Sequence, residues 1–177
     1  MAYTTIDDPS AYFKVQLYTG TGSGGSDRQI TFDDTDTDMQ PDLVWIKNRG
    51  TNYSHMVVDT VRGAGKYLEA NSSNDEDDAN ANGNLTSFTS DGFVTTRGSS
   101  NGGRVNENSE TYVSWNWKGS DSAAAANDDG TIDSTVSVNA TAGFSVGTFS
   151  GTGSAGTIGH GLGVAPQFIL IKSRENN

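Results

Sequence analysis

Two histidines, His55 and His160, are the side chains of this chain best suited to acid–base chemistry at neutral pH. A catalytic histidine needs an activated nucleophile within reach, and no Gly-x-Ser-x-Gly nucleophile motif occurs. His160 lies between Gly159 and Gly161, a context typical of a turn. The chain has no cysteine, which excludes disulfides, thiolate metal sites and cysteine nucleophiles. We therefore predict a protein that is not an enzyme and has no catalytic residue.

Clustered carboxylates make calcium binding the second candidate chemistry. The candidate metal ligands alternate along one loop, at Asp34, Asp36 and Asp38. A complete calcium loop would need glycine where Met39 stands and glutamate where Trp45 stands. A second acidic cluster covers residues 75–78. Bound Ca²⁺ would relieve the repulsion within each cluster, but solvated loops explain an incomplete ligand pattern better. No other cofactor is expected.

Aromatic side chains suggest a third chemistry, the stacking of sugar rings on Trp45, Trp115 or Trp117. Trp115 and Trp117 share a predicted strand face with Val113, and large aromatic residues dominate the cores of β-sandwiches. Core packing is therefore the expected role of these indoles. For a sugar site, the polar loops are the first places to look: Asn52, Tyr53 and residues 71–84.

The charge of the chain limits its partners. It has 22 acidic residues against 11 basic ones, for a net charge of −11. Nucleic acids and anionic lipids both require clustered Lys and Arg, so we expect neither as a partner. The sequence has no apolar run long enough to span a membrane, and its N-terminus lacks the basic and apolar regions of a secretion signal. Release by cell lysis is the expected route if the protein leaves its cell.

Alternation of apolar and polar residues with period two recurs along the chain and predicts strands. It places Phe13, Val15 and Leu17 on one face, and the run 43–46 is apolar on both faces, as in a central strand. The other predicted strands are residues 29–32, 56–61, 85–88, 93–96, 111–118 and 132–138. Glycine-rich polar loops separate them. The pattern predicts an all-β, antiparallel sandwich, with residues 62–70 as the single candidate for a short helix.

An internal repeat organises the chain. Residues 13–23 recur as 144–154 with six of eleven positions identical, and residues 41–49 recur as 166–174 in the same order. We therefore divide the chain into an N-terminal arm (1–12), a first β-sandwich repeat (13–118), a linker (119–130) and the opening strands of a second, incomplete repeat (131–177).

Such an opening would leave strand edges and an apolar face uncovered. We expect either that more chain follows or that a neighbouring subunit completes the last strands.

Several short motifs, taken in order, resemble a repeat family of large phage proteins. They are Asp7-Asp-Pro-Ser-Ala-Tyr-Phe13, Leu17-Tyr-Thr-Gly20, Pro41-Asp-Leu-Val-Trp-Ile-Lys47, Val61-Arg-Gly63, Tyr112-Val-Ser-Trp-Asn-Trp-Lys118 and Gly159-His-Gly-Leu-Gly-Val-Ala-Pro166. The resemblance covers nearly the whole chain. It implies a lectin-like jelly roll, similar to concanavalin, in a tail-fibre or other virion surface protein, and it brings no catalytic residue with it.

The resemblance favours a bacteriophage structural protein that acts by assembly and adhesion. It implies assembly in the host cytoplasm, a place in the virion, and partners that are other virion proteins and copies of the chain itself in a trimer or other ring. A host glycan is a further expected partner. Two alternatives stay open: a lectin domain of a secreted bacterial protein, and a virion depolymerase, which would need paired carboxylates in a cleft.

Overall fold

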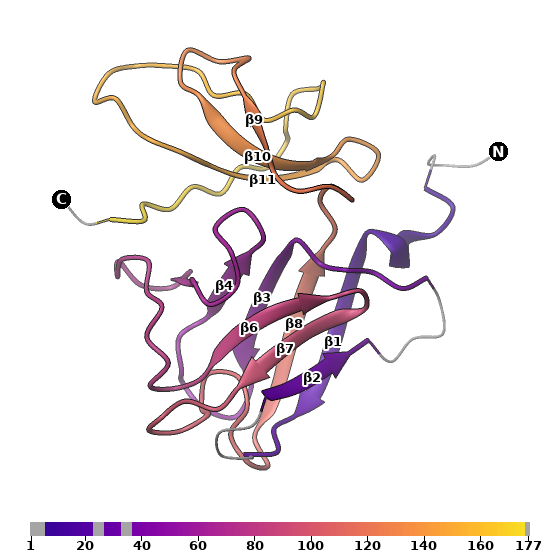
Figure 1. Cartoon of the computed structure of the whole chain (residues 1–177), viewed down its shortest axis with the longest axis vertical. Helices are drawn as coiled ribbons and strands as arrows, with labels where there is room; N and C mark the ends of the chain where they lie inside the picture. The colour runs from indigo at the N-terminus through magenta and orange to yellow at the C-terminus, as the bar shows by residue number, and fades with distance from the viewer. Residues whose placement is uncertain (1–5, 23–26, 33–36, 176–177) are drawn as a thin grey trace.

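The computed structural model describes residues 6–22, 27–32 and 37–175, and it confirms an all-β fold. These described residues form three antiparallel sheets (Figure 1). The first has the order β1 (Phe13–Thr19), β8 (Thr111–Trp117), β3 (Leu43–Asn48), β4 (Met56–Asp59) and β5 (Leu68–Glu69). The second has the order β2 (Asp27–Thr31), β7 (Gly92–Thr96) and β6 (Asn84–Thr89). The third has the order β11 (Phe144–Phe149), β10 (Ser134–Asn139) and β9 (Ala125–Asn127).

The first two sheets pack face to face and form the predicted sandwich. Figure 1 shows β2, β7 and β6 lying across β1, β8 and β3. Burial alternates along each of these three long strands, as a sheet with one covered face requires. The core between the sheets holds Tyr18, Ile30, Phe32, Met39, Val44, Ile46, Met56, Val58, Tyr67, Leu85, Phe93, Val105 and Tyr112. The central position predicted for residues 43–46 is confirmed, because β3 lies between β8 and β4.

The expected core packing of Trp115 and Trp117 is wrong. The inner face of β8 carries Tyr112, Ser114 and Asn116, each 0% exposed, and the two indoles therefore point to the other face of the sheet. The small inner side chains sit beside polar ones of β1. Asn116 donates one hydrogen bond to the backbone oxygen of Lys14 at 3.0 Å and another to the hydroxyl of Ser114 at 3.0 Å. These hydrogen bonds satisfy buried polar groups on the inner face of β8, and the two tryptophans of β8 lie on its outer face.

The single helix candidate, residues 62–70, forms turns and the short strand β5. Gly63 and Gly65 have φ angles of 95° and 87°, in the left-handed region that an α-helix does not use. The helical content of the described ranges is instead one 3₁₀ turn, η1 (Pro9–Ala11), which Asp8 caps by accepting a hydrogen bond from the Ser10 N–H.

The third sheet lies beyond one end of the sandwich and contains part of the predicted second repeat (Figure 1). The repeated residues 144–149 form β11, as their counterparts 13–18 lie in β1. Residues 166–174, the counterpart of the segment that contains β3, belong to no strand. Their apolar members Phe168, Ile169, Leu170 and Ile171 are 62–80% exposed. The repeated segments 41–49 and 166–174 therefore share a sequence pattern, but only the first of them contains a strand with neighbouring strands on both sides.

Candidate functional site

The most distinctive surface of the molecule is the side of the five-stranded sheet that faces away from the sandwich core. We call it the outer face, and it comprises Phe13, Val15 and Leu17 of β1, Val113, Trp115 and Trp117 of β8, and Leu43, Trp45 and Lys47 of β3. Strand register arranges these side chains in three rows across the sheet. Most members are apolar, and none carries a carboxylate. The absence of carboxylates from this surface is notable, because the chain as a whole has a net charge of −11.

The three rows follow directly from the strand pairing. Phe13 pairs with Trp117, which pairs with Leu43; Val15, Trp115 and Trp45 form the middle row; Leu17, Val113 and Lys47 form the third. Cross-strand neighbours in an antiparallel sheet lie close enough for aromatic side chains to touch. The ring centroids of Phe13 and Trp117 are accordingly 5.0 Å apart, and those of Trp45 and Trp115 are 6.3 Å apart.

Exposure rises along β1, away from the end of the sheet that carries Trp117. Phe13 is 39% exposed, Val15 50% and Leu17 55%. An isolated exposed apolar residue is ordinary, but a continuous apolar patch on a folded domain marks an interaction site. The outer face is a continuous apolar patch, and it is therefore the candidate interaction surface of this protein.

A polar group of side chains borders the middle row. The Trp45 indole N–H donates a hydrogen bond to Nδ1 of His55 at 2.8 Å, and the two rings meet edge to face. Burial and the nearby charge of Lys47 lower the pKa of His55 below its ordinary 6.5, so the imidazole is neutral at pH 7. The neutral ring accepts from Trp45 through Nδ1 and keeps the proton on Nε2.

The loop between β3 and β4 supports this group. The Lys47 ammonium donates to the backbone oxygens of Asn48 and Thr51, at 2.5 and 2.9 Å. The backbone N–H of His55 donates to the Asn71 side chain at 2.9 Å. His55 therefore links Asn71, the first residue of the predicted sugar loop 71–84, to Trp45. The planes of Trp45 and Trp115 cross at 75°, so the two indoles present an angled corner and not one flat platform.

The third sheet covers one end of the outer face. Phe144, the first residue of β11, stacks on Trp117 with centroids 6.1 Å apart and planes 16° apart. Phe144 is the repeat counterpart of Phe13, which contacts the same indole. An apolar side chain of one repeat therefore packs on the outer face of the other, and the middle and third rows continue from this contact.

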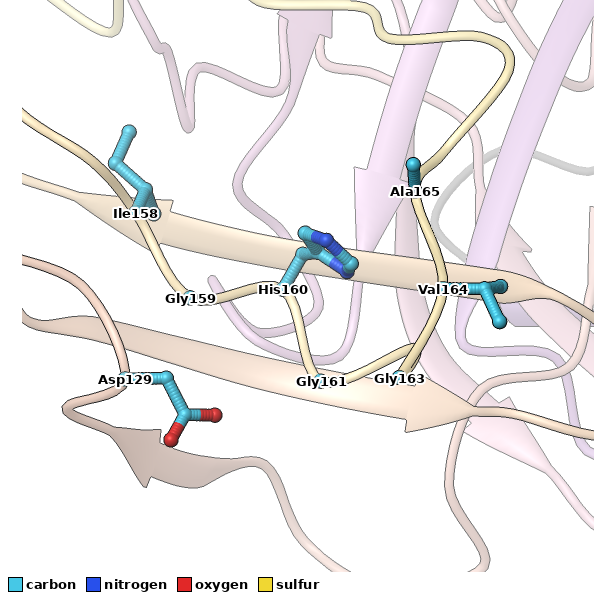
Figure 2. A pocket seen from close by; sticks show the side chains of 8 residues that line it. All are labelled: Asp129, Ile158, Gly159, His160, Gly161, Gly163, Val164 and Ala165. Carbon is cyan, nitrogen blue, oxygen red and sulfur yellow. The ribbon is translucent and has the colours of Figure 1, made fainter.

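His160 lies apart from this surface, in the loop region that follows β11. A shallow pocket of about 460 Å³ lies at this histidine. It is lined by Asp129, from the segment between β9 and β10, and by Ile158, Gly159, His160, Gly161, Gly163, Val164 and Ala165 (Figure 2). Nδ1 of His160 accepts a hydrogen bond from the backbone N–H of Leu162 at 3.1 Å. Gly161 and Gly163 both have left-handed φ angles, of 72° and 73°. The chain bends at Gly161 and again at Gly163 and Val164, and the hydrogen bond from Leu162 holds the imidazole against the first bend.

The candidate calcium ligands are only partly visible. Asp34 and Asp36 lie outside the described residues, and Asp38 is exposed. Within the described residues, no group of three or more His, Asp or Glu side chains is arranged to hold a metal ion. In the second acidic cluster, Glu76 binds Arg62 and Arg174 at 3.2 and 2.7 Å, and Asp77 accepts from the Tyr67 hydroxyl at 2.8 Å. Protein cations and donors therefore already satisfy part of that cluster.

Sequence reasoning found the tryptophans but placed two of them on the wrong side of the sheet. The signal that distinguishes the faces is the polar, small character of Ser114 and Asn116 together with the alternating Lys14 and Gln16 of β1. All four are buried between the sheets. Alternation alone favours burial of the more apolar face of β8, which carries Trp115 and Trp117. Only the position of the second sheet shows that the opposite face is the buried one.

Comparison with known proteins identifies the family of this chain but assigns no function to it. Neither curated proteins nor solved structures gave a match. No helix in the described part of the chain is long and apolar enough to cross a membrane. A family model described as a domain of unknown function, DUF7483, matches residues 8–177. Since this match spans most of the sequence, the chain belongs to the DUF7483 family.

Proposed function

We propose that this protein is a bacteriophage virion structural protein, a tail-fibre or host-contact module that acts by assembly and adhesion and not by catalysis. The observation that carries the proposal is the outer face of β1, β8 and β3. Val15 and Leu17 are 50% and 55% exposed on it, and Trp115 and Trp45 complete the row of Val15. A surface of this kind is suited to burial against another protein, because association removes its apolar area from water.

The motif resemblance supplies the virion setting of the proposal, and the internal repeat supports an extended assembly. Repeated units that contact their neighbours build long structures from short sequences. The stacking of Phe144 on Trp117 is one such contact within the chain. The occupant that we assign to the remaining outer face is likewise a copy of this chain.

A second candidate function, carbohydrate binding by a lectin-like domain, rests on the group formed by Trp45, Trp115 and His55. Here an indole held by a hydrogen bond lies beside a neutral imidazole with one N–H directed away from the indole, and the Lys47 ammonium is close by. Sugars are bound by apolar ring faces combined with a few polar donors of this sort. This candidate predicts that Trp45→Ala removes glycan binding, while Val15→Ala leaves it.

The two candidates and the enzymatic alternative are separated by three measurements on the full chain. Gold-labelled antibody against the chain should decorate tail appendages of particles in electron micrographs, and label restricted to cell debris would overturn the virion assignment. A glycan array tests adhesion directly. Incubation with host envelope polysaccharide tests turnover. Binding without release of reducing sugar supports adhesion, absence of both supports assembly alone, and release of reducing sugar would contradict a non-catalytic role.

A further inference from the structure

The large apolar side chains that remain exposed fall into two groups. Apart from Phe149, those in the described ranges belong either to β1 or to residues 164–171. In the second group Phe168 is 80% exposed and Leu170 is 62% exposed. We call residues 164–171 the apolar segment. Each group alone is an unfavourable surface in water, and burial of one against the other would remove both.

The fold keeps these two groups apart within one molecule. The residues that follow the apolar segment are fixed beside β5: the Lys172 ammonium donates to the backbone oxygens of Ser72 and Asn74, at 3.1 and 2.9 Å. The Arg174 guanidinium pairs with Glu76 through contacts of 2.7 and 2.9 Å. β5 and β1 are the two opposite edges of the five-stranded sheet. Figure 1 shows the chain approaching its C-terminus on the side of the molecule away from β1.

Charge limits which surfaces of this protein can meet. Two copies, each with a net charge of −11, repel each other, and contacts between acidic surfaces would add to that repulsion. The outer face and residues 164–172 both lack Asp and Glu, although the chain contains 22 acidic residues. These two surfaces can therefore approach each other with less repulsion than two acidic surfaces.

The repeat shows that the apolar segment has a sequence suited to close packing. Phe168-Ile169-Leu170-Ile171 corresponds to Leu43-Val44-Trp45-Ile46 of β3. In β3, both neighbouring strands are present, Val44 and Ile46 are 0% exposed, and Leu43 and Trp45 are partly covered. The apolar segment carries the same apolar pattern without such neighbours.

From these observations we infer that copies of this chain associate head to tail, with the apolar segment of one copy packed on the outer face of the next, over Val15, Leu17 and Trp115. The contact continues the one that Phe144 already makes with Trp117. Because the two surfaces differ, the contact is heterologous and builds a ring or a filament, whichever its rotation dictates. This inference rests on the proposed function and names the partner through which assembly takes place.

Complementation between two variants tests the inference. Val15→Asp/Leu17→Asp places charge on the outer face, and Phe168→Asp/Leu170→Asp places it on the apolar segment. All four side chains are at least 50% exposed, so the fold should persist, and near-ultraviolet circular dichroism checks it. The matched control is Thr86→Asp on β6, an exposed position in the other sheet.

Sedimentation velocity of the full chain should show wild type and Thr86→Asp associating to the same extent. Each double variant alone should be weakened at least about tenfold. An equimolar mixture of the two should form dimers and nothing larger, because only one intact junction remains per pair. A monomeric wild type would overturn the inference, as would association of the apolar-segment variant with itself, which would indicate packing of outer face on outer face.

The failure of this inference can be told apart from the failure of the proposed function. If labelled virions carry the protein but the wild-type chain is monomeric, the virion assignment stands and another protein covers the outer face. If the chain associates head to tail but no particle is labelled, the self-contact stands and the virion setting is wrong.

Discussion

The carboxylate of Asp42 accepts a hydrogen bond from the hydroxyl of Ser137, 95 residues further along the chain, at 3.3 Å. It also accepts from the backbone N–H of Gly119 at 2.8 Å and from the hydroxyl of Thr60 at 2.7 Å. Asp42 is 3% exposed and Ser137 is 0% exposed. One buried side chain at the start of β3 thus links the sandwich, the chain that leaves β8, and β10 of the third sheet.

Replacement of Asp42 by Asn should loosen this junction. The amide has only one acceptor oxygen, and its NH₂ group would face a donor, so a buried N–H or O–H loses its partner at a cost of about 1–3 kcal/mol. Calorimetry should show a lower melting temperature, with the third sheet unfolding ahead of the sandwich. Asp38→Asn, at an exposed position, is the control. An Asp42→Asn protein that melts like wild type in one transition would show that the junction does not depend on this carboxylate.

Arg62 should be among the least tolerant positions in the protein. Its side chain is 3% exposed, and it pairs with Asp59 at 2.6 Å and with Glu76 at 3.2 Å. It also donates to the backbone oxygen of Val57 at 3.0 Å. Removal of one partner from a buried ion pair costs about 3–5 kcal/mol, because the other charge stays buried without compensation. We expect urea unfolding of Arg62→Met to show a loss of this size and that of the exposed Arg49→Met to show almost none; equal effects would refute the assignment.

Much of the fold was predictable because its strands carry period-two patterns bounded by glycine-rich loops. β3 was also predictable as a central strand, since residues 43–46 are all apolar and would therefore present apolar side chains on both faces of the strand. The orientation of β8 was not. Val113, Trp115 and Trp117 are more apolar than Tyr112, Ser114 and Asn116, and local pattern favours burying the larger set. The sheet of β2, β7 and β6 covers the face that carries Tyr112. Its position depends on contacts between residues far apart in the sequence, so the pattern within β8 cannot predict it.

The candidate site was predictable in its residues but not in its surface. Trp45 and the loops near Tyr53 and Asn71 stood out from residue type alone, whereas the bond between Trp45 and His55 depends on the register of the β3–β4 hairpin. The outer face appears only when strands from distant parts of the chain are paired. Phe13 and Trp117 are neighbours on that face, but they lie at opposite ends of the first repeat.

Alkaline pH should unfold the protein through its buried tyrosines. Burial raises the pKa of Tyr112 to about 12 and that of Tyr67 to about 12, and it raises the pKa of Tyr18 well above the ordinary 10.0. A raised pKa in the folded state means that this stabilisation is complete below pH 10 and is lost as the pH rises toward 12. Tyrosinate absorbance should therefore have a late component that coincides with loss of circular dichroism. That component should shrink in Tyr112→Phe; reversible titration of every tyrosine near pH 10 without unfolding would contradict the burial.

Acid should weaken the tether between Glu76 and the C-terminal residues. Burial opposes ionisation of Glu76, but hydrogen bonds from Arg174 and Arg62 outweigh it and lower the pKa of the carboxyl below its ordinary 4.5. The stabilisation from a lowered pKa is present above pH 4.5 and is lost as the pH falls through the folded-state value. Glu76→Gln should therefore be less stable than wild type in urea at pH 7, and the difference should shrink as the pH falls below 4.5 and wild-type Glu76 becomes protonated. A difference that persisted unchanged in acid would rule out this ion pair as its source.

The most direct test of the outer face as the interaction surface is site-specific photo-crosslinking in assembled particles. A photoreactive amino acid at position 15, on the exposed outer face of β1, should give crosslinked products that contain a second copy of the chain, with adducts mapped by mass spectrometry to residues 164–171. The same group at position 86, on the exposed face of the opposite sheet, should give none. Crosslinks from position 86 together with none from position 15 would contradict the account.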